Sequence, residues 1–424
     1  MNTLKKVFYL LFISINILHA QRGGSLPITT VQQSPMLLGA GQTGAALPNN
    51  DVLGFYYNPA ILGYSAQNNH VAFSFMPTST EWGTLHYSDL TFNNFGLNLG
   101  YNLRESKFNL PVTIGFGLLR NKFSYGKFNN NENDDYYDSF NTYSLGIGLN
   151  YFLNFYFGLS LKTFHSEILG FSPTHYNDAT QRKYEADGTL LDYGLLVIFP
   201  ISKIFLQKKN FYISEKSILK PVANFSIGYS LSNYGDEFYY NNLQQQTSPF
   251  SRTARIGYTF EIGTQLVTNN FLLNIFNYSF TAEASDLLIK EERFDDDGNP
   301  LSNNGSQYQS GLLGDINFPD HLITLESNGK VMIHKGHIFK FFDTFIYTTG
   351  RFVNGGYLDS RKTNGLGFTS KGIFKILKTQ ITQPTVNYIL NHFEIEYFNS
   401  NVEFWKKRFT NFDSLTLRFK GFAI

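Results

Sequence analysis

The sequence predicts an all-β fold: a transmembrane antiparallel β-barrel of about 14 strands with an N-terminal plug segment. Three observations predict it. Apolar residues alternate with small or polar ones in segment after segment, the gaps between segments are long and short in turn, and the chain starts with an export signal. Successive side chains of a strand point to opposite faces, so each alternating segment has one apolar face and one polar face.

The N-terminal residues have the pattern of a secretory signal peptide. Lys5 and Lys6 supply positive charge, residues 7–17 are apolar, and a cleavage site follows at Ala20. A membrane-anchoring helix is the alternative, but the apolar stretch is short for a span of about 20 residues. The expected parts of the chain are a signal peptide over residues 1–20, a periplasmic or plug segment over 21–69, and an outer-membrane barrel over 70–424.

Composition excludes several classes of function. The net charge of +1 gives no case for nucleic-acid binding, and the absence of cysteine excludes thiolate catalysis and cysteine-ligated metal. Aromatic residues make up 17% of the chain, which suits the aromatic girdles of a membrane barrel, although a compositional bias is the alternative cause. The barrel also implies that outer-membrane lipid surrounds the chain.

The alternating segments give the expected strands, with ends uncertain by about 2–4 residues. The expected strands cover residues 70–76, 84–103, 112–125, 139–153, 155–165, 190–199, 221–232, 251–264, 271–284, 321–333, 337–349, 363–377, 391–399 and 413–423.

The connections between these segments sort by length. The long, polar set consists of residues 126–138, 166–189, 233–250, 285–320, 350–362 and 400–412, and the short set of 104–111, 154, 265–270 and 334–336. Outer-membrane barrels have long external loops and short periplasmic turns, whereas a soluble β-sandwich has no reason to separate its loops in this way. Residues 200–220 and 378–390 break the rule. Either each forms a short periplasmic element, or the strand count fails there.

Polar residues are expected to face the barrel lumen. The residues chosen for this role alternate with apolar neighbours and are Arg255, Glu261, Glu394, Glu396, Arg418 and Lys420. Charged side chains would be costly in hydrocarbon, so we expect them inside the barrel. The alternative is a soluble β protein whose polar face is solvated.

The segment before the first strand has a different character. Residues 22–69 are rich in glycine, proline and alanine and show no sustained alternation, so we expect them to start in the periplasm and to plug the lumen from below. Residues 39–44 match G-x-G-x-x-G, but a dinucleotide site needs a strand before the motif and a helix after it, which the surrounding prolines disfavour. Close packing of the backbone in a narrow space is the preferred interpretation.

The same segment carries a family resemblance. Residues 38–46, then Asp51, then the aromatic-Asn-Pro-Ala motif at 55–60 resemble the N-terminal signature of the PorV/PorQ family of the type IX secretion system and of the wider FadL-like family of transporters. Residues 73–77, 230–235, 249–257 and 416–419 favour the PorV side of this resemblance. The signature residues are Gly39, Gly41, Gly44, Asp51, Asn58, Pro59 and Ala60, and their implied role is to seat the plug.

The resemblance implies two functions. A PorV-like protein is a non-enzymatic part of protein secretion in the outer membrane of a Bacteroidetes-like Gram-negative bacterium, and its partners are secreted client proteins or translocon components. Its long external loops, above all residues 285–320, would then carry the partner contacts. A FadL-like protein is instead a passive transporter of hydrophobic small molecules. A structural barrel without transport is a third possibility.

Catalytic, cofactor and metal sites find little support. The sequence has no G-x-S-x-G or H-E-x-x-H motif, so we expect no enzyme and no cofactor, although a serine–histidine pair on neighbouring strands would leave no sequence signal. Asp295, Asp297 and Asn299 are spaced as in a calcium loop. Pro300 stands where such a loop has glycine, so an exposed acidic loop is the preferred interpretation.

Overall fold

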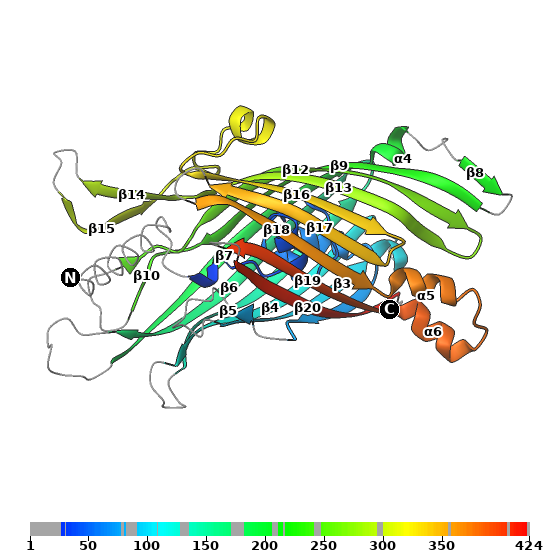
Figure 1. Ribbon diagram of the computed structural model, residues 1–424, viewed down its shortest axis with the longest axis horizontal. Helices are drawn as coiled ribbons and strands as arrows, with labels where there is room; N and C mark the ends of the chain where they lie inside the picture. Colours follow the sequence, from blue (N-terminus) through cyan, green and yellow to red (C-terminus); the bar gives the residue numbers. More distant parts are fainter. Residues whose placement is uncertain are drawn as a thin grey trace, which may run out of the picture.

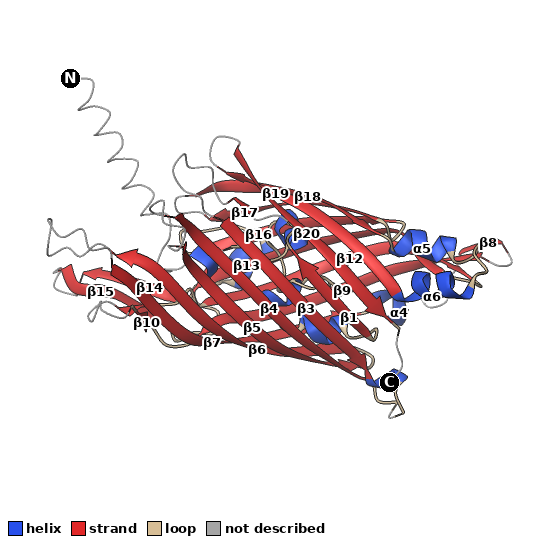
Figure 2. Cartoon of the chain, turned by 90° about the horizontal axis from the view of Figure 1, so that it is seen from below, coloured by secondary structure: helices blue, strands red, loops and turns tan. Residues whose placement is uncertain are grey.

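The chain folds into a closed antiparallel β-barrel (Figures 1 and 2). The computed structural model describes residues 27–29, 31–77, 80–81, 91–107, 109–127, 135–170, 182–205, 211–214, 217–240, 247–294, 300–354, 358–404 and 408–421. The expected signal peptide lies outside these residues. Apart from the short accessory strands β2 (Thr80–Glu81) and β8 (Phe211–Ser214), 14 strands of the 16-stranded sheet form the wall, and β1 pairs with both β3 and β20 to close it.

The wall strands follow one another in chain order around the barrel. They are β1 (His70–Phe75), β3 (Thr91–Asn102), β4 (Val112–Lys127), β5 (Asp135–Asn150), β6 (Asn154–Gly170), β7 (Arg182–Phe199), β9 (Ser217–Tyr234), β12 (Thr253–Thr268), β13 (Leu272–Leu287), β16 (Val331–Phe341), β17 (Phe345–Asn354), β18 (Leu358–Thr369), β19 (Phe393–Phe404) and β20 (Arg408–Lys420). Closure leaves none of these strands as an open edge, which is what a sheet in hydrocarbon requires.

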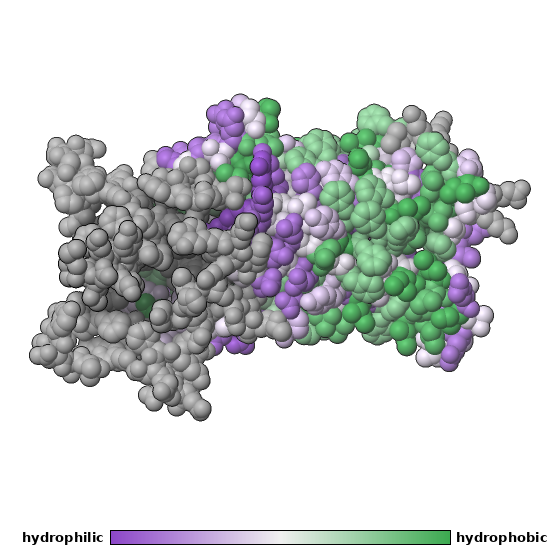
Figure 3. All heavy atoms as spheres, viewed as in Figure 1, coloured by the Kyte–Doolittle hydropathy of each residue, from purple (hydrophilic) through white to green (hydrophobic). Residues whose placement is uncertain are grey.

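A hydrophobic belt surrounds one half of the barrel. Figure 3 shows apolar residues gathered in a band over the half of the barrel nearer the α5–α6 hairpin (Lys371–Leu377 and Pro384–His392). Exposed apolar side chains of the wall strands include Phe116, Leu145, Ile147, Phe157, Leu159, Ile227, Phe260, Ile262, Leu366, Ile395 and Leu417. A continuous apolar surface of this kind is costly in water and is stable against lipid tails. Among the described residues, no helix has the length and apolar character needed to cross a membrane.

The two ends of the barrel differ. The short-turn end carries the tight connections 151–153, 269–271 and 342–344, and it also carries α4 (Ile201–Phe205), β8 and the α5–α6 hairpin. The expected connections 200–220 and 378–390, which broke the length rule, cover residues 200–216 and 370–392 in the structure. Both contain short elements, and the strand count of 14 holds. The opposite end, here named the long-loop end, carries the hairpin of β14 (Ile289–Phe294) and β15 (Pro300–Tyr308) and the short pair β10 (Phe238–Tyr239) and β11 (Thr247–Ser248).

Several expected boundaries are wrong. Residues 334–336 are not a turn, because β16 runs straight through them and the turn lies at 342–344. Residues 371–377 form helix α5 and not the end of a strand. The expected long loops 350–362 and 400–412 are mostly strand, since β17, β18, β19 and β20 extend into them as antiparallel ladders.

The residues before β1 lie inside the barrel. Here they are named the inner segment (residues 27–29 and 31–69), and they contain η1 (Pro27–Thr29), α2 (Pro35–Gly39), η2 (Gly54–Tyr56) and α3 (Ile61–Ser65). These short helices contact wall strands from several sides, and Figures 1 and 2 show them enclosed by the wall. Ile28 lies among side chains of the long-loop half, so the segment runs from there toward the short-turn end, where His70 begins β1. Two further turns complete the described helices, η3 (Leu103–Glu105) and η4 (Pro319–Ile323).

Candidate functional site

Wall glycines make room for the inner segment. A Cβ atom built on Gly158 would lie 2.1 Å from the carbonyl carbon of Pro59, and one on Gly194 would lie 2.0 Å from Oδ1 of Asn58. Backbone and side chain cannot approach so closely if the wall residue is larger than glycine. Wall glycines with a Cβ that would meet the inner segment are Gly96, Gly100, Gly115, Gly117, Gly146, Gly158, Gly194, Gly228, Gly336 and Gly350. These inward glycines form a seat shaped to the segment.

The glycines of the signature lie against the wall on the opposite side. A Cβ atom on Gly39 would lie 2.2 Å from Oγ1 of Thr348, and one on Gly41 would lie 2.2 Å from the carbonyl oxygen of Lys335. Gly41 also has a φ of +75°, which L side chains rarely adopt. The G-x-G-x-x-G run therefore allows its backbone to approach the wall closely and to make a tight turn.

A buried carboxylate binds the backbone of the same run. Glu283 of β13 accepts hydrogen bonds from the backbone N–H of Gly44 at 2.9 Å and of Ala46 at 3.0 Å. Nη1 of Arg255 lies 3.5 Å from Oε2 of Glu283, and Arg255 also donates to the carbonyl oxygen of Gln42. Glu283 thus accepts hydrogen bonds from N–H groups of the loop, and Arg255 donates one to a carbonyl of the loop. The opposite charges of the two side chains balance each other in a site that is almost closed to water.

His334 adds a further contact to this loop. Its Nδ1 lies 3.1 Å from the carbonyl oxygen of Gly41, and its Nε2 lies 2.9 Å from Oγ of Ser285. Glu283 follows the polar alternation of residues 277–285, which is the signal that could have identified it as a lumen residue. His334 was expected in a tight turn, because it stands in a polar run (residues 334–337) that shows no alternation.

The remaining signature residues lie deeper in the inner segment. Asp51 accepts hydrogen bonds from Oγ of Ser34 and from the backbone N–H of Leu53 at 3.0 Å. Burial raises the pKa of Asp51, although these hydrogen bonds and the nearby Arg418 oppose the rise. Asn58 donates to the carbonyl oxygens of Ala45 at 2.6 Å and of Leu195 in the wall at 3.0 Å.

Asn58 also starts the turn that follows it. Its Oδ1 accepts the backbone N–H of Ala60 at 3.0 Å, which fixes Pro59 between the two. Pro59 and Ala60 then face Gly158 and Gly194 of the wall. The signature residues are thus together in the lumen, and most of them contact the wall.

Four of the six charged lumen residues named from the sequence lie together near the short-turn end. Glu394 pairs with Arg418 at 3.2 Å and with Lys420 at 2.8 Å, and Glu396 lies two residues farther along the same face of β19. Glu261 lies on another side of the lumen, where it accepts hydrogen bonds from Asn224 at 2.7 Å and Asn277 at 2.6 Å. These two groups do not contact one another through any hydrogen bond of the described residues. Arg255 belongs to the Glu283 group instead.

The interior changes character in the long-loop half. On β6, the outward face is apolar at Leu159 and Leu161 and then polar at Thr163, while the inward face changes from Lys162 to Phe164. Inward aromatic residues at similar heights are Phe92 of β3, Phe123 of β4, Phe140 of β5, Phe352 of β17 and Phe412 of β20. The polar lumen expected from the sequence is therefore wrong for this half, where the apolar face of the strands points inward.

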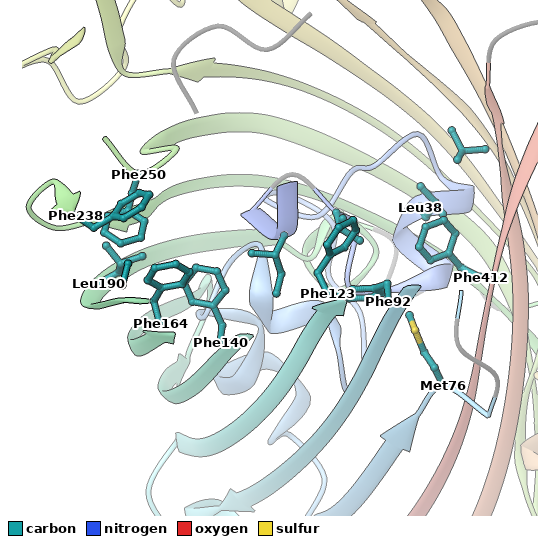
Figure 4. Close-up of a cluster of buried hydrophobic side chains, with 14 of the residues drawn as sticks. Leu38, Met76, Phe92, Phe123, Phe140, Phe164, Leu190, Phe238, Phe250 and Phe412 are labelled. Atoms are coloured by element: carbon teal, nitrogen blue, oxygen red, sulfur yellow. The ribbon is translucent and has the colours of Figure 1, made fainter. Parts of the chain in front are cut away.

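These side chains form one apolar cluster, which Figure 4 shows projecting from the wall into the lumen. The cluster consists of Ile28, Val31, Leu38, Met76, Phe92, Phe123, Phe140, Phe164, Ala186, Leu190, Phe238, Phe250, Phe352, Val402 and Phe412. Phe164 stands at its centre on the β6 side, with ring centroids 5.1 Å from Phe140 and 5.2 Å from Phe250. Phe238 lies 4.6 Å from Phe250. Rings at such separations attract each other beyond the burial of their area.

The expected metal site and the expected partner-contact loop lie wholly or partly outside the residues that the structure describes. Asp295, Asp297 and Asn299 lie outside the described residues, so the calcium-loop spacing stays a prediction. Within the expected contact loop 285–320, the described part contains β14, β15 and the start of η4. Ile316 and Leu322 pack there against Val331 and Ile333 of β16.

Neither a protein-family model nor a curated protein sequence matches this chain. Among solved structures, the chain is similar to the toluene transporter TbuX of Ralstonia pickettii, with 9% identity over 92% of this chain and 98% of that one and a TM-score of 0.40. The toluene transporter TodX of Pseudomonas putida gives 10% identity, 91% and 97% coverage and a TM-score of 0.38. A FadL homologue of Pseudomonas aeruginosa gives 9% identity, 94% and 99% coverage and a TM-score of 0.38. Values this low assign neither a family nor a function to the chain.

Proposed function

We propose that this protein is a non-enzymatic outer-membrane channel for the passive transport of hydrophobic small molecules. The observation that carries the proposal is the apolar cluster inside the long-loop half of the lumen. Porin-like barrels have a polar, water-filled interior, so an apolar lining marks a different solute. A hydrophobic molecule that enters this half leaves water, which contributes about 25 cal/mol for each Å² of apolar surface removed.

The hydrophobic belt supports the location. The belt and the expected export signal both favour the outer membrane of a Gram-negative bacterium, with the long-loop end outside the cell and the short-turn end in the periplasm. In this orientation, the apolar cluster faces the outside, above the level of the lipid tails. A solute that enters from outside would therefore meet the apolar cluster first, where Ile28, Val31 and Leu38 of the inner segment lie beside the wall phenylalanines.

The inner segment would control passage. Its contacts with the wall glycines and with Glu283 close the middle of the lumen, so a solute passes only when part of the segment moves. Backbone hydrogen bonds hold the segment, and apolar side chains such as Leu37, Phe55 and Leu62 are also buried against the wall. Passage would therefore use a local movement of part of the segment and not its complete release.

Protein secretion, which the sequence resemblance placed first, becomes the second candidate. It depends on the long loops, and parts of these loops lie outside the described residues. No contact within the described part of the chain favours secretion over transport. The resemblance alone keeps the PorV-like role and its Bacteroidetes-like source as proposals.

A deletion strain separates the two functions. We expect the strain to take up alkylbenzenes and similar solutes more slowly and to keep normal maturation of its surface proteins. The uptake of labelled solute and the profile of surface proteins are measured in the same cultures, with the gene restored as the control. Normal uptake together with defective surface proteins would reverse the order of the two candidates.

A further inference from the structure

A row of polar side chains lies directly beneath the apolar cluster. Thr142 of β5 and Lys162 of β6 are paired across the two strands, and Ser144 is paired with Ser160 one inward position lower. Asp192 of β7 faces Ser160. We name these five residues the polar floor. All five are buried in the wall and point inward.

The charges of the polar floor are already matched. Nζ of Lys162 lies 2.7 Å from Oδ2 of Asp192 and donates to Oδ1 of Asn233 at 2.9 Å. It also lies 4.1 Å from the ring centroid of Tyr56 in the inner segment. The ammonium group is thereby surrounded by a carboxylate, an amide oxygen and an aromatic face, so the pair carries no net charge.

Two hydroxyl groups at the polar floor are not matched. The hydroxyl of Tyr56 and Oγ1 of Thr142 are buried and make no hydrogen bond with any residue that the structure describes. Ser144 and Ser160, by contrast, bond to each other at 2.6 Å. A buried hydroxyl without a partner costs about 1–3 kcal/mol, which a suitable ligand group would recover.

The unmatched hydroxyls belong to one place. Tyr56 lies over Lys162, and Thr142 stands beside Lys162 in the wall, between it and Leu119. Leu119 and Tyr56 share one buried cluster. The inward neighbours two residues away from the polar floor are Phe140, Phe164 and Leu190, which belong to the apolar cluster. Residues i and i+2 of a strand lie about 6–7 Å apart, roughly the length of a benzene ring with one substituent.

We propose that the polar floor is the head-group site of the channel, and that its preferred solutes are hydrophobic molecules with one uncharged hydroxyl group, such as alkylphenols. The inference rests on the proposed transport function. The hydroxyl of the solute would bond to Tyr56 and Thr142, while its apolar part lies among Phe140 and Phe164. A carboxylate head would add a negative charge beside a pair that is already neutral, and a buried uncompensated charge is costly.

The test compares three solutes that share the butylbenzene skeleton and differ in the para group, on the full mature protein purified in detergent. They are 4-butylphenol, butylbenzene and 4-butylbenzoate, and their dissociation constants are measured by calorimetry. We expect the phenol to bind about tenfold more tightly than butylbenzene, since one recovered hydrogen bond contributes about 1–2 kcal/mol. Tyr56→Phe and Thr142→Val remove one hydroxyl each and should lower this preference without changing the affinity for butylbenzene.

A matched variant controls for the loss of a lumen hydroxyl. Thr281→Val removes a hydroxyl that bonds to Thr259 at 2.9 Å in another part of the wall, so the phenol preference should be unchanged. Equal binding of 4-butylphenol and butylbenzene to the native protein would overturn the head-group site, because the hydroxyls of Tyr56 and Thr142 would then gain no hydrogen bond from the solute. Tighter binding of the benzoate would also overturn it. Failure of all three solutes to bind would instead contradict the proposed transport function itself.

Discussion

At the scale of single residues, Glu283 joins the inner segment to the wall through several contacts of one side chain. It binds two backbone N–H groups of the inner segment and pairs with Arg255, and all of these groups are buried. Glu283→Ala should lower the free energy of unfolding by about 3–5 kcal/mol, because it leaves a buried arginine without its partner. Urea titration of the protein in lipid vesicles measures this change.

The double variant Glu283→Met with Arg255→Met is the control. It removes both charges, so it should cost clearly less than Glu283→Ala alone. Equal losses in the two proteins would show that the hydrogen bonds to the inner segment, and not the unpaired charge, account for the effect. A loss below about 1 kcal/mol in the single variant would contradict the proposed role of Glu283.

The wall glycines provide a second prediction. Gly158→Val puts side-chain atoms where the backbone of Pro59 and Ala60 now lies, so the inner segment should be displaced while the wall still closes. Overpacking of this kind costs about 1–3 kcal/mol. We expect a higher conductance for salt in planar bilayers. Gly311→Ala is the control, because a Cβ atom there would make only an ordinary van der Waals contact, 3.6 Å from the backbone nitrogen of Gly314. Equal conductance in both variants would refute the seat.

Only one side of these contacts could be predicted from the sequence. The signature residues of the inner segment stand close together in the sequence, so they form a recognisable motif. Glu283 and His334 lie more than 200 positions away from the loop that they bind, and nothing local connects them to it. Glu283 and His334 face each other in the ladder of β13 and β16, and this register is not visible in the sequence, because 43 residues separate the two strands.

At the scale of elements, β6 shows where the lipid-facing surface ends. Its outward side chains are apolar up to Leu161 and polar at Thr163, His165 and Glu167. Leu159→Arg should lower the free energy of unfolding by about 2–4 kcal/mol, whereas Thr163→Arg should lower it by about 0–1 kcal/mol. Reversible unfolding in vesicles gives both values. Similar costs at the two positions would place the membrane boundary elsewhere.

The turn between β16 and β17 provides a pH-dependent prediction. Burial alone would raise the pKa of Asp343, but Lys371 and Lys375 of α5, together with Asn274, lower it to about 2. Nζ of Lys375 lies 2.8 Å from Oδ2 of Asp343. A carboxyl with a lowered pKa stabilises the fold at pH values above its ordinary pKa and loses this contribution as the pH falls toward the lowered value.

The native protein should therefore exceed Asp343→Asn in stability by about 2 kcal/mol above pH 4, and the difference should vanish toward pH 2. Urea titrations of both proteins across this range measure the difference. A difference that is constant down to pH 2 would mean that the ion pairs do not stabilise the attachment of α5.

The elements that the sequence predicted well are those inside the belt. Alternation in residues 139–149 and 155–165 identified β5 and β6. Lipid outside the wall favours apolar residues, the inner segment inside it favours small or polar residues, and neighbouring residues of a strand face these two sides in turn. The predictions failed where these demands end. Gly336 suggested a turn, but it is an inward wall glycine that faces Ala40. Helix α5 lies beyond the wall, where alternation no longer applies.

At the scale of the whole molecule, the barrel has two different halves. One half has an apolar exterior and an interior of glycine and polar residues filled by the inner segment. The other half has the reverse arrangement, with the apolar cluster inside. The aromatic content of the sequence predicted the first arrangement through its lipid-facing side chains, but it could not assign individual phenylalanines to the inner face, since that requires the height of each residue along the barrel.

The same arrangement makes a prediction about the inner segment as a unit. Solutes that reach the apolar cluster should pass only if the segment moves from its place. The native chain has no cysteine, so a single engineered disulfide can hold the segment without competing thiols. Oγ1 of Thr29 lies 2.9 Å from Oγ of Ser251, two residues before β12, which makes this pair a suitable position for a bond between the segment and the long-loop end of the barrel.

The most direct test of the account is therefore the uptake of butylbenzene by cells that carry Thr29→Cys with Ser251→Cys. With the disulfide formed, uptake should fall to the level of the deletion strain, and it should return to the native level after reduction. The two single variants should transport normally under both conditions. Uptake by the oxidised double variant at the native rate would contradict the account, since hydrophobic solutes would then cross without any release of the inner segment.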